Sequence, residues 1–325
     1  MPQIKRRDFI GALTGTAFAS ALSKPAWPRK KHRESGETDA SVFVLGTAQD
    51  GGFPHIGCYC KNCAFARRFP GKSRTIASLA LLDHKDNKVF LVDCTPDIRT
   101  QYDKIHRRLE LQGTRRCVPD GILLTHAHIG HYTGLIFYGY EALSAEGMPV
   151  YATTSMAKFL GGNGPWDRLV SLKNIELRVT EPSTPIILNE RISVSAFPVP
   201  HRAEYTDTVG FLVSGKTRRL IYIPDIQDWD SWEENIAEVC TEVDYALLDG
   251  TFFSPNELPG RDLSKIGHPF IVDTMRRLQK TSSQCGIYFT HLNHSNPALF
   301  PDCGVLEKIQ QMGFGLAEED MEFFI

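Results

Sequence analysis

Three histidines lie directly after an apolar run, at the spacing H-x-H-x-x-H: His126, His128 and His131. A neutral imidazole nitrogen is a ligand for zinc, iron or manganese. Because His126 and His128 are two residues apart, an extended or turning backbone can direct both rings at one ion. His131 can then face a second ion beside the first. A lone histidine after a strand is usually structural, but three at this spacing predict a metal site on a rigid framework.

The framework is predicted from short β-branched runs bounded by turns. They predict strands at residues 41–46, 78–83, 88–93, 121–126, 192–199, 209–215, 219–225, 245–250 and 286–291. Amphipathic patterns predict helices at residues 97–111, 131–145, 231–239 and 269–280. Strands in runs with helices between them favour an α/β fold of two sheets covered by helices.

Further residues of metal-ligand type stand at the ends of predicted strands. His201, Asp225 and His291 each follow an apolar strand, as His126 does. Strand ends on a rigid sheet are where convergent ligands are normally positioned. Alone, His201 would be weak evidence, and Asp225 would be a turn or cap residue rather than a bridge between two ions. Four such strand ends together favour one shared site.

The composition allows a substantial hydrophobic core and limits the kinds of binding partner. The chain has 325 residues, of which 42% are hydrophobic, and a net charge of -2. That is enough apolar material for one large domain or two small ones. The balanced charge gives no case for nucleic acid as partner. A small-molecule substrate is expected, and a homodimer is left open.

The first residues predict an export signal. A basic start, Lys5 to Arg7, precedes a weakly apolar run at residues 9–22 that is too short to span a membrane. The paired arginines resemble a twin-arginine signal, which implies contact with the export machinery and a periplasmic or extracellular location. The alternative is a disordered basic tail. We expect a leader at residues 1–27, a polar linker at 28–40 and the folded domain at 41–325.

Eight cysteines in an exported chain first suggest disulfides. Cys58, Cys60 and Cys63, however, form C-x-C-x-x-C, which is too tight for an ordinary disulfide framework. Most of the others are expected to be small buried hydrophobic residues. They are Cys94, Cys117, Cys240, Cys285 and Cys303.

The histidine motif THAHIGHYTGL resembles the H-x-H-x-D-H signature of the metallo-β-lactamase superfamily. His201, Asp225 and His291 follow in that family's order and rough spacing. The resemblance would cover residues 42–325 and implies an αββα sandwich with the metals between the sheet edges. Other blocks, including VLGTAQDGGFPHIGCYCKNC, LLDGTFF, GRDLSKIGH and THLNHSNP, resemble the B protein of pyrroloquinoline quinone biosynthesis.

The resemblance implies two kinds of metal site. The C-x-C-x-x-C motif also occurs in the related cyclic phosphodiesterase of phosphonate breakdown, where it holds a structural zinc with a later histidine. Carried over, that zinc takes four residues: Cys58, Cys60, Cys63 and His294. The alternative is three cysteines without a metal. In the active site the first ion takes His126, His128 and His201, and the second takes His131, Asp225 and His291.

The motif lacks its aspartate, because Gly130 stands in that position. Glycine supplies no ligand, so we expect the second ion to bind ~10–100-fold more weakly. Water, or Asp225 moving closer, could compensate. The resemblance adds two residues: Asp93, which would orient a histidine ligand, and His268, which would stabilise or protonate the leaving group. Their alternatives are a strand-end turn and a helix N-terminal residue.

Three functions follow from these residues. The first is a metal-dependent hydrolase that cleaves a phosphodiester or another small ester-like bond with a metal-activated water. The second is an oxygen-dependent iron enzyme linked to pyrroloquinoline quinone biosynthesis. The third is an exported metal-binding protein without catalysis. The hydrolase is preferred, with one or two Zn²⁺, Mn²⁺ or Fe²⁺ ions in the active site.

Overall fold

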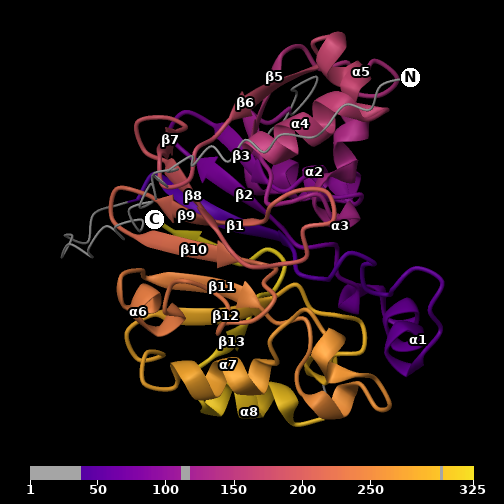
Figure 1. The fold of residues 1–325 in the computed structure, drawn as a ribbon, viewed down its shortest axis with the longest axis vertical. Helices are drawn as coiled ribbons and strands as arrows, with labels where there is room; N and C mark the ends of the chain where they lie inside the picture. The colour runs from indigo at the N-terminus through magenta and orange to yellow at the C-terminus, as the bar shows by residue number, and fades with distance from the viewer. Residues whose placement is uncertain (1–37, 111–117, 301–302) are drawn as a thin grey trace, which may run out of the picture.

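The computed structural model describes residues 38–110, 118–300 and 303–325, and these form two seven-stranded sheets (Figure 1). The first sheet has the order β14-β1-β2-β3-β4-β5-β6. Its strands are β1 Ala40–Gly46, β2 Ser78–Asp83, β3 Lys88–Val92, β4 Gly121–Leu123, β5 Met148–Ala152, β6 Ile175–Val179 and β14 Glu322–Phe324. The second sheet has the order β13-β12-β11-β10-β9-β8-β7. Its strands are β7 Pro185–Ile187, β8 Ser193–Pro198, β9 Val209–Ser214, β10 Arg219–Ile223, β11 Tyr245–Asp249, β12 Gly286–Thr290 and β13 Gly315–Leu316.

The two sheets share an apolar core between them. Alternate residues of each strand point to opposite faces of the sheet, so one strand can contribute side chains to two separate hydrophobic cores. In β1, Val42 and Val44 join the core between the sheets, while Phe43 packs under the helices of the first sheet. In β10, Tyr222 faces the central core and Ile221 faces the helices of the second sheet. The central strands are therefore apolar on both faces.

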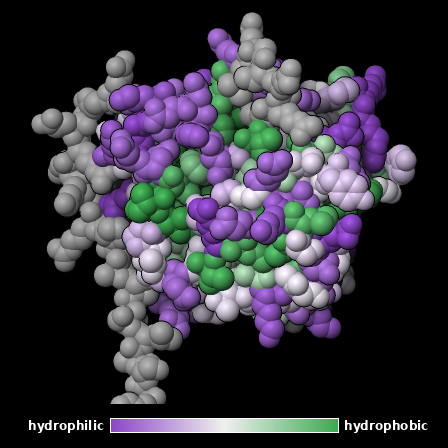
Figure 2. Space-filling model, turned by 90° about the horizontal axis from the view of Figure 1, so that it is seen from above, coloured by the Kyte–Doolittle hydropathy of each residue, from purple (hydrophilic) through white to green (hydrophobic). Residues whose placement is uncertain are grey.

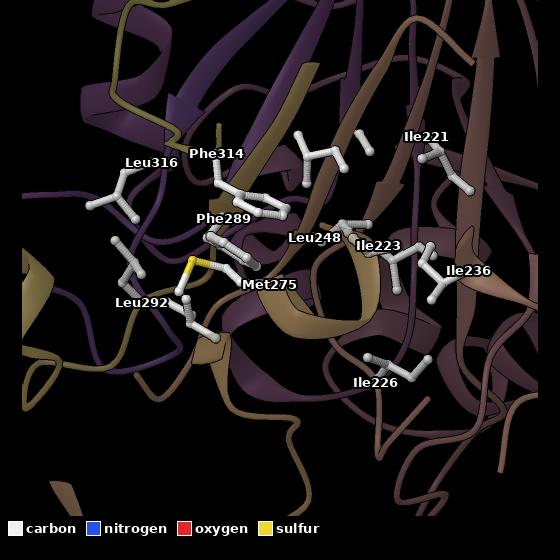
Figure 3. Packing of buried hydrophobic residues seen from close by; sticks show 14 of the residues in the cluster. Ile221, Ile223, Ile226, Ile236, Leu248, Met275, Phe289, Leu292, Phe314 and Leu316 are labelled. Atoms are coloured by element: carbon white, nitrogen blue, oxygen red, sulfur yellow. The ribbon is translucent and has the colours of Figure 1, made fainter. Parts of the chain in front are cut away.

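Helices cover the outer face of each sheet. The helices are α1 Lys61–Arg68, α2 Ile98–Arg108, α3 Ile129–Tyr132, α4 Thr154–Gly162, α5 Trp166–Ser171, α6 Ile236–Thr241, α7 Ile271–Leu278 and α8 Val305–Gln311. Of these, α1 lies to one side of the two sheets (Figure 1). Ile105 of α2 and Leu160 of α4 pack on the first sheet. Met275 of α7 packs with Phe289 and Leu248 on the second (Figure 3). The fold is the predicted αββα sandwich.

All nine predicted strands are present, but one predicted helix is wrong. Residues 131–145 do not form a single helix, because α3 ends at Tyr132 and a 3₁₀ segment, Thr133–Tyr138, follows. The amide of Gly134 donates to the carbonyl of Cys94, 2.9 Å away, instead of continuing an α-helix. The helix predicted at 231–239 is also shorter, since α6 begins at Ile236.

The surface mixes polar and apolar residues. Figure 2 shows the molecule from above, with apolar patches separated by polar side chains. Within the described ranges, no helix has both the length and the apolar character needed to cross a membrane. The predicted leader, most of the linker and Cys117 lie outside those ranges.

Candidate metal centre

The first sheet supplies site residues from the carboxyl ends of β3 and β4, which are parallel neighbours. Because parallel strands end at the same edge of a sheet, Asp93 after β3 meets Thr125 and His126 after β4. Thr125 donates to Asp93 through its backbone amide and its hydroxyl, each at 2.9 Å. Nδ1 of His131 lies 2.7 Å from Asp93 Oδ2. Asp93 thus holds the turn that carries the histidine motif.

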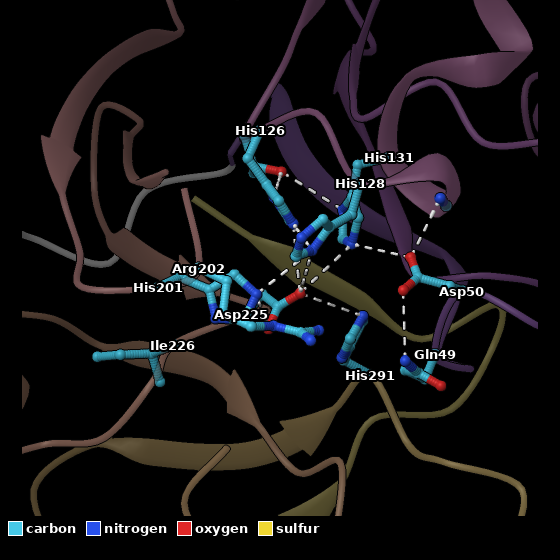
Figure 4. Close-up of polar contacts among 12 residues, drawn as sticks. Gln49, Asp50, His126, His128, His131, His201, Arg202, Asp225, Ile226 and His291 are labelled. Atoms are coloured by element: carbon cyan, nitrogen blue, oxygen red, sulfur yellow. Dashed lines mark hydrogen bonds and ion pairs between the residues drawn. The ribbon is translucent and has the colours of Figure 1, made fainter. Parts of the chain in front are cut away.

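The second sheet presents a facing edge. β10, β11 and β12 are parallel, so Asp225, Asp249 and His291 lie side by side at or just after their ends. β8 runs in the same direction as β10, because both are antiparallel to β9. His201 follows β8 and therefore reaches the same edge. The two sheet edges face each other across a cluster of imidazoles (Figure 4).

Four side chains from both edges form a first ligand group: His126, His128, His201 and Asp225. His126 Nε2 lies 3.3 Å from Asp225 Oδ2, and His201 Nε2 lies 3.2 Å from Oδ1. His128 Nδ1 is 2.9 Å from His126 Nε2 and 3.3 Å from His201 Nε2. Ligand bonds of about 2.0–2.2 Å separate two ligands of a tetrahedral ion by about 3.4 Å. The group therefore fits one divalent ion.

The carboxylate of Asp225 faces a second group on its other side. Its Oδ2 lies 3.9 Å from His131 Nε2 and 3.8 Å from His291 Nε2. Both Nε2 atoms are buried and have no hydrogen-bond partner among the described residues. Burying an unpaired polar atom is costly. The lone pairs of these two nitrogens fit a second ion.

The opposite nitrogens of these rings are held by the protein. The pairs are His126 Nδ1 with Thr125 Oγ1, His131 Nδ1 with Asp93 Oδ2 and His291 Nδ1 with Thr251 Oγ1, at 3.0, 2.7 and 3.0 Å. Such contacts fix the ring orientation and tautomer of metal-binding histidines. His128 is held from the surface instead, with Nε2 3.2 Å from Glu204 Oε2. Thr125, Thr251, Asp249 and Glu204 were not predicted from the sequence.

The protonation of three rings suits cation binding. Burial lowers the pKa of His126 strongly, the pKa of His201 to about 4, and the pKa of His291 as well. A low pKa leaves an imidazole neutral at pH 7, with a free lone pair. Burial would also lower the pKa of His131, but Asp93 and then Asp50 raise it to about 9. The second group therefore favours positive charge.

Asp50 is a residue of this cluster that the sequence did not reveal. The backbone amide of Gly130 donates to Asp50 Oδ1 at 3.1 Å, and His131 Nε2 lies 3.6 Å from the same oxygen. Asp50, His131 and His291 form a possible ligand group. The available signal was an aspartate in the turn D-G-G after a strand, in a chain whose motif lacks its carboxylate.

His268 lies beside the second group. Its Nδ1 is 2.8 Å from Asp249 Oδ2 and 3.2 Å from Asp225 Oδ1. Burial would lower its pKa, but Asp249 and Asp225 raise it to about 9. An imidazole that is protonated near neutral pH can donate a proton to a reacting group.

The predicted cysteine cluster forms a separate group near the surface. His294 Nδ1 lies 3.7, 3.6 and 3.5 Å from the Sγ atoms of Cys58, Cys60 and Cys63. Tetrahedral zinc, with Zn–S of about 2.3 Å and Zn–N of about 2.0–2.1 Å, separates sulfur from nitrogen by about 3.6 Å. Burial raises the pKa of Cys63 to about 12, so its thiol is neutral until an ion displaces the proton. The four side chains fit a closed tetrahedral site.

The family is decided by a match to the β-lactamase superfamily domain across residues 88–292. The chain belongs to the metallo-β-lactamase superfamily. That match includes both ligand groups except Asp50, which precedes it. The resemblance predicted from the histidine motif is confirmed.

Within the superfamily, the chain is similar to the branch that the sequence blocks predicted. It is 25% identical over 311 residues to coenzyme PQQ synthesis protein B of Cupriavidus necator, covering 87% of this chain and 98% of that protein. The Gluconobacter oxydans protein of the same name is 27% identical over 314 residues, covering 87% and 97%.

Solved structures show the same fold. Zinc-bound PqqB from Methylobacterium extorquens has a TM-score of 0.74 at 22% identity, covering 88% of this chain and 100% of that one. A diphosphatase from the PhnP family has a TM-score of 0.63 at 22% identity, covering 87% and 96%. These likenesses concern the fold, whereas the fit to divalent metal comes from the ligand groups of this chain.

Proposed function

We propose that the chain is a metal-dependent hydrolase that cleaves a phosphodiester or another small ester-like bond. The observation that carries this proposal is the position of Asp225. Its Oδ2 lies 3.3 Å from His126 on one side and 3.9 and 3.8 Å from His131 and His291 on the other. One carboxylate thus serves two adjoining ligand groups, which is typical of two-metal hydrolytic sites.

A bound divalent ion would lower the pKa of a water ligand to about 7 and polarise the oxygen of the bond being cleaved. The residues around the ions have distinct tasks in this proposal. His126, His128 and His201 would hold the first ion, His131 and His291 would hold the second, and Asp225 lies close enough to contribute to either. Asp93 is a positioning residue, because it contacts Nδ1 of His131 and is itself fully buried, out of reach of a substrate.

His268 is proposed as the proton donor to the leaving group. Its Nδ1 is engaged by Asp249, which fixes the ring and supports its protonated form. Its side chain is 8% exposed, against 2% for Asp225, so it lies toward the outer side of the centre. A substrate would approach from the side of His128 and Asp50, whose side chains are 17% and 22% exposed.

A second candidate is an oxygen-dependent iron enzyme linked to pyrroloquinoline quinone biosynthesis. The names of the similar proteins, and their coverage of 87% of this chain, favour it. Histidine and carboxylate ligands accept iron as well as zinc or manganese.

We propose zinc for the cysteine cluster. Export by the leader and the domain boundaries remain predictions.

The test is hydrolysis of bis(p-nitrophenyl) phosphate and of a phenyl phosphodiester by protein reconstituted with Zn²⁺, Mn²⁺ or Fe²⁺. His126→Ala should abolish turnover with either substrate. His268→Asn should lower kcat by ~10²–10⁴-fold for phenol release, as expected for loss of a general acid. The loss should be smaller for p-nitrophenol, because a more acidic leaving group needs less protonation.

The same samples decide between the candidates. Turnover with zinc or manganese in the absence of oxygen supports the hydrolase. If no metal gives hydrolysis, and only the iron form consumes oxygen with an added quinone precursor, the hydrolase proposal is wrong and the second candidate replaces it.

A further inference from the structure

We propose that Asp50 supplies the carboxylate ligand that the histidine motif lacks at Gly130, so that a second ion is held by His131, His291, Asp225 and Asp50. This inference rests on the proposed metal centre and deepens it. It replaces the expectation of a second site that is one carboxylate short. The ligand would come from the turn after β1 and not from the motif itself.

The position of the carboxylate carries the first step. A Cβ atom built on Gly130 would collide with Asp50 Oδ1 and come within 2.8 Å of Asp50 Cα. The side chain of Asp50 therefore occupies the space in which an aspartate at position 130 would begin. Its Oδ1 lies 3.6 Å from His131 Nε2, too far for a hydrogen bond but close to the spacing of two ligands on one ion.

The second step is the orientation of the two histidines. His131 and His291 are fully buried, and their Nε2 atoms are without hydrogen-bond partners in the described part of the chain. Both rings have their Nδ1 atoms engaged, by Asp93 and Thr251. The Nε2 lone pairs are thus turned toward the space that Asp50 and Asp225 border (Figure 4). Two imidazole nitrogens and two carboxylates make a suitable ligand set for a divalent ion.

The third step is the rigidity of the turn that carries Asp50. The amide of Gln49 donates to the carbonyl of Leu292 at 3.0 Å, and the amide of Leu292 donates to Thr47 at 2.8 Å. These bonds tie the turn directly to the residue after His291. The Gly130 amide then fixes the carboxylate itself. A ligand held by the backbone of its neighbours needs little ordering when the ion arrives.

Gly130 and Asp50 therefore depend on each other. Gly130 is required because the turn passes too close for any side chain, and Asp50 is required because Gly130 cannot be a ligand. The carboxylate stands 80 positions before the glycine in the sequence, yet it accepts a hydrogen bond from the glycine's amide.

Counting ions tests this without relying on turnover. Wild type, Asp50→Asn and the control Asp103→Asn, an exposed carboxylate on α2, are loaded with Mn²⁺ by equilibrium dialysis. Wild type and the control should hold two manganese ions in the histidine centre, with the magnetic coupling of a close pair by electron paramagnetic resonance. Asp50→Asn should weaken the second ion at least about 10-fold and leave the uncoupled signal of one ion.

Gly130→Ala provides an independent variant, because it leaves the carboxylate in the chain but pushes it away. It too should lose the second ion and keep the first. If Asp50→Asn, with unchanged circular dichroism, binds two coupled ions with wild-type affinity, the inference is wrong even if hydrolysis is observed. If wild type itself binds no second ion, the inference and the two-ion form of the proposed function fail together.

Discussion

The histidine–aspartate centre and the cysteine cluster are built on opposite principles. In the histidine centre the rings of His126, His131 and His291 each have a protein partner on the nitrogen that faces away from the ions. In the cysteine cluster Cys58 and His294 are only half-buried, and Cys60 is exposed. The first site is shaped by the ends of sheet strands, whereas the second is shaped by loops and the start of α1 (Figure 1).

This difference concerns what each ion does for the protein. Strand ends are fixed by the sheets, so the histidine centre should keep its geometry when its ions leave. The loop of the cysteine cluster has no sheet to define it, so its ion should contribute to folding. The two sites are nevertheless connected, because Asp50 leads into the cysteine loop and His291 stands three residues before His294. If the two sites depend on each other, loss of the ion from one should empty the other.

The largest effect is expected from Cys63→Ser, which removes the buried thiol of the cluster. Zinc should be lost, because the closed site would keep only three of its four ligands. Metal-coupled folding is worth about 10–16 kcal/mol in isolated zinc-finger peptides, so amide exchange in residues 55–69 should accelerate at least ~100-fold. Elemental analysis and hydrogen exchange measure both changes.

Cys303→Ser is the matched control, because Cys303 is exposed and outside the cluster. Zinc content equal to that of wild type in Cys63→Ser would contradict the assignment. Loss of manganese from the histidine centre in the same variant would mean that the two sites are not independent, because the cysteine loop would then be needed to hold Asp50 in place.

The next effect is expected from Asp93→Asn, which changes only the partner of a ligand. The amide would still contact Thr125 and His131 but would carry no charge. Affinity for manganese should fall ~10–100-fold, as for other residues that orient metal-binding histidines, while zinc in the cysteine cluster is unchanged. Metal titration of the manganese form measures this. Equal affinities for the variant and wild type would mean that the sheet edge alone fixes His131.

A smaller effect is expected at Glu257, a partly buried carboxyl. Its carboxyl accepts a hydrogen bond from the Phe253 amide at 2.7 Å and another from Ser295, beside His294. Burial raises its pKa from 4.5 to about 7. The folded state binds the proton of Glu257 more tightly than the unfolded state does. The contribution of this carboxyl to the free energy of unfolding is therefore full below pH 4.5 and is lost as the pH rises through about 7.

Glu257→Gln removes this titration. Relative to wild type, the variant should gain about 2 kcal/mol in the free energy of unfolding between pH 5 and pH 8, allowing for partial solvent screening. Urea unfolding of both proteins at the two pH values measures the difference. A difference that does not change with pH would mean that the carboxyl is not protonated in the folded protein.

The parts of the fold that the sequence predicted are those set by local patterns. β-Branched runs located nine strands, and ligand-type residues directly after them located both sheet edges, because a strand and its last residues are contiguous. The helices α4 and α5 were not predicted, and the turn between them separates Gly162 from Trp166. The N-cap of α4, where Thr153 accepts from the Met156 amide at 3.2 Å, was an available signal.

Asp50 could not be predicted in the same way. The only local signal was an aspartate in the turn D-G-G, and its contact with Gly130 exists only after β1 and the segment of His291 are joined. Asp249 and Thr251 were equally unpredictable. They hold the rings of His268 and His291 from the second sheet. Asp93 and Thr125 hold the rings of His131 and His126 from the first sheet in the same way. Ligands were visible as residue types, but their supports follow from tertiary structure.

The smallest effect is expected from Glu204→Gln, which affects only the outer side of the histidine centre. Among the described residues, Glu204 is the only charged partner of His128 Nε2, and its side chain is 49% exposed. An exposed ion pair contributes ~0–1 kcal/mol, so the affinity for the first ion should change by less than about 5-fold, as measured by metal titration. A loss as large as that of Asp93→Asn would mean that the loop of residues 203–208 is closed over the centre and shields this pair from water. His128 would then be as firmly built as the buried ligands, and rigidity would extend to the open side from which a substrate must enter.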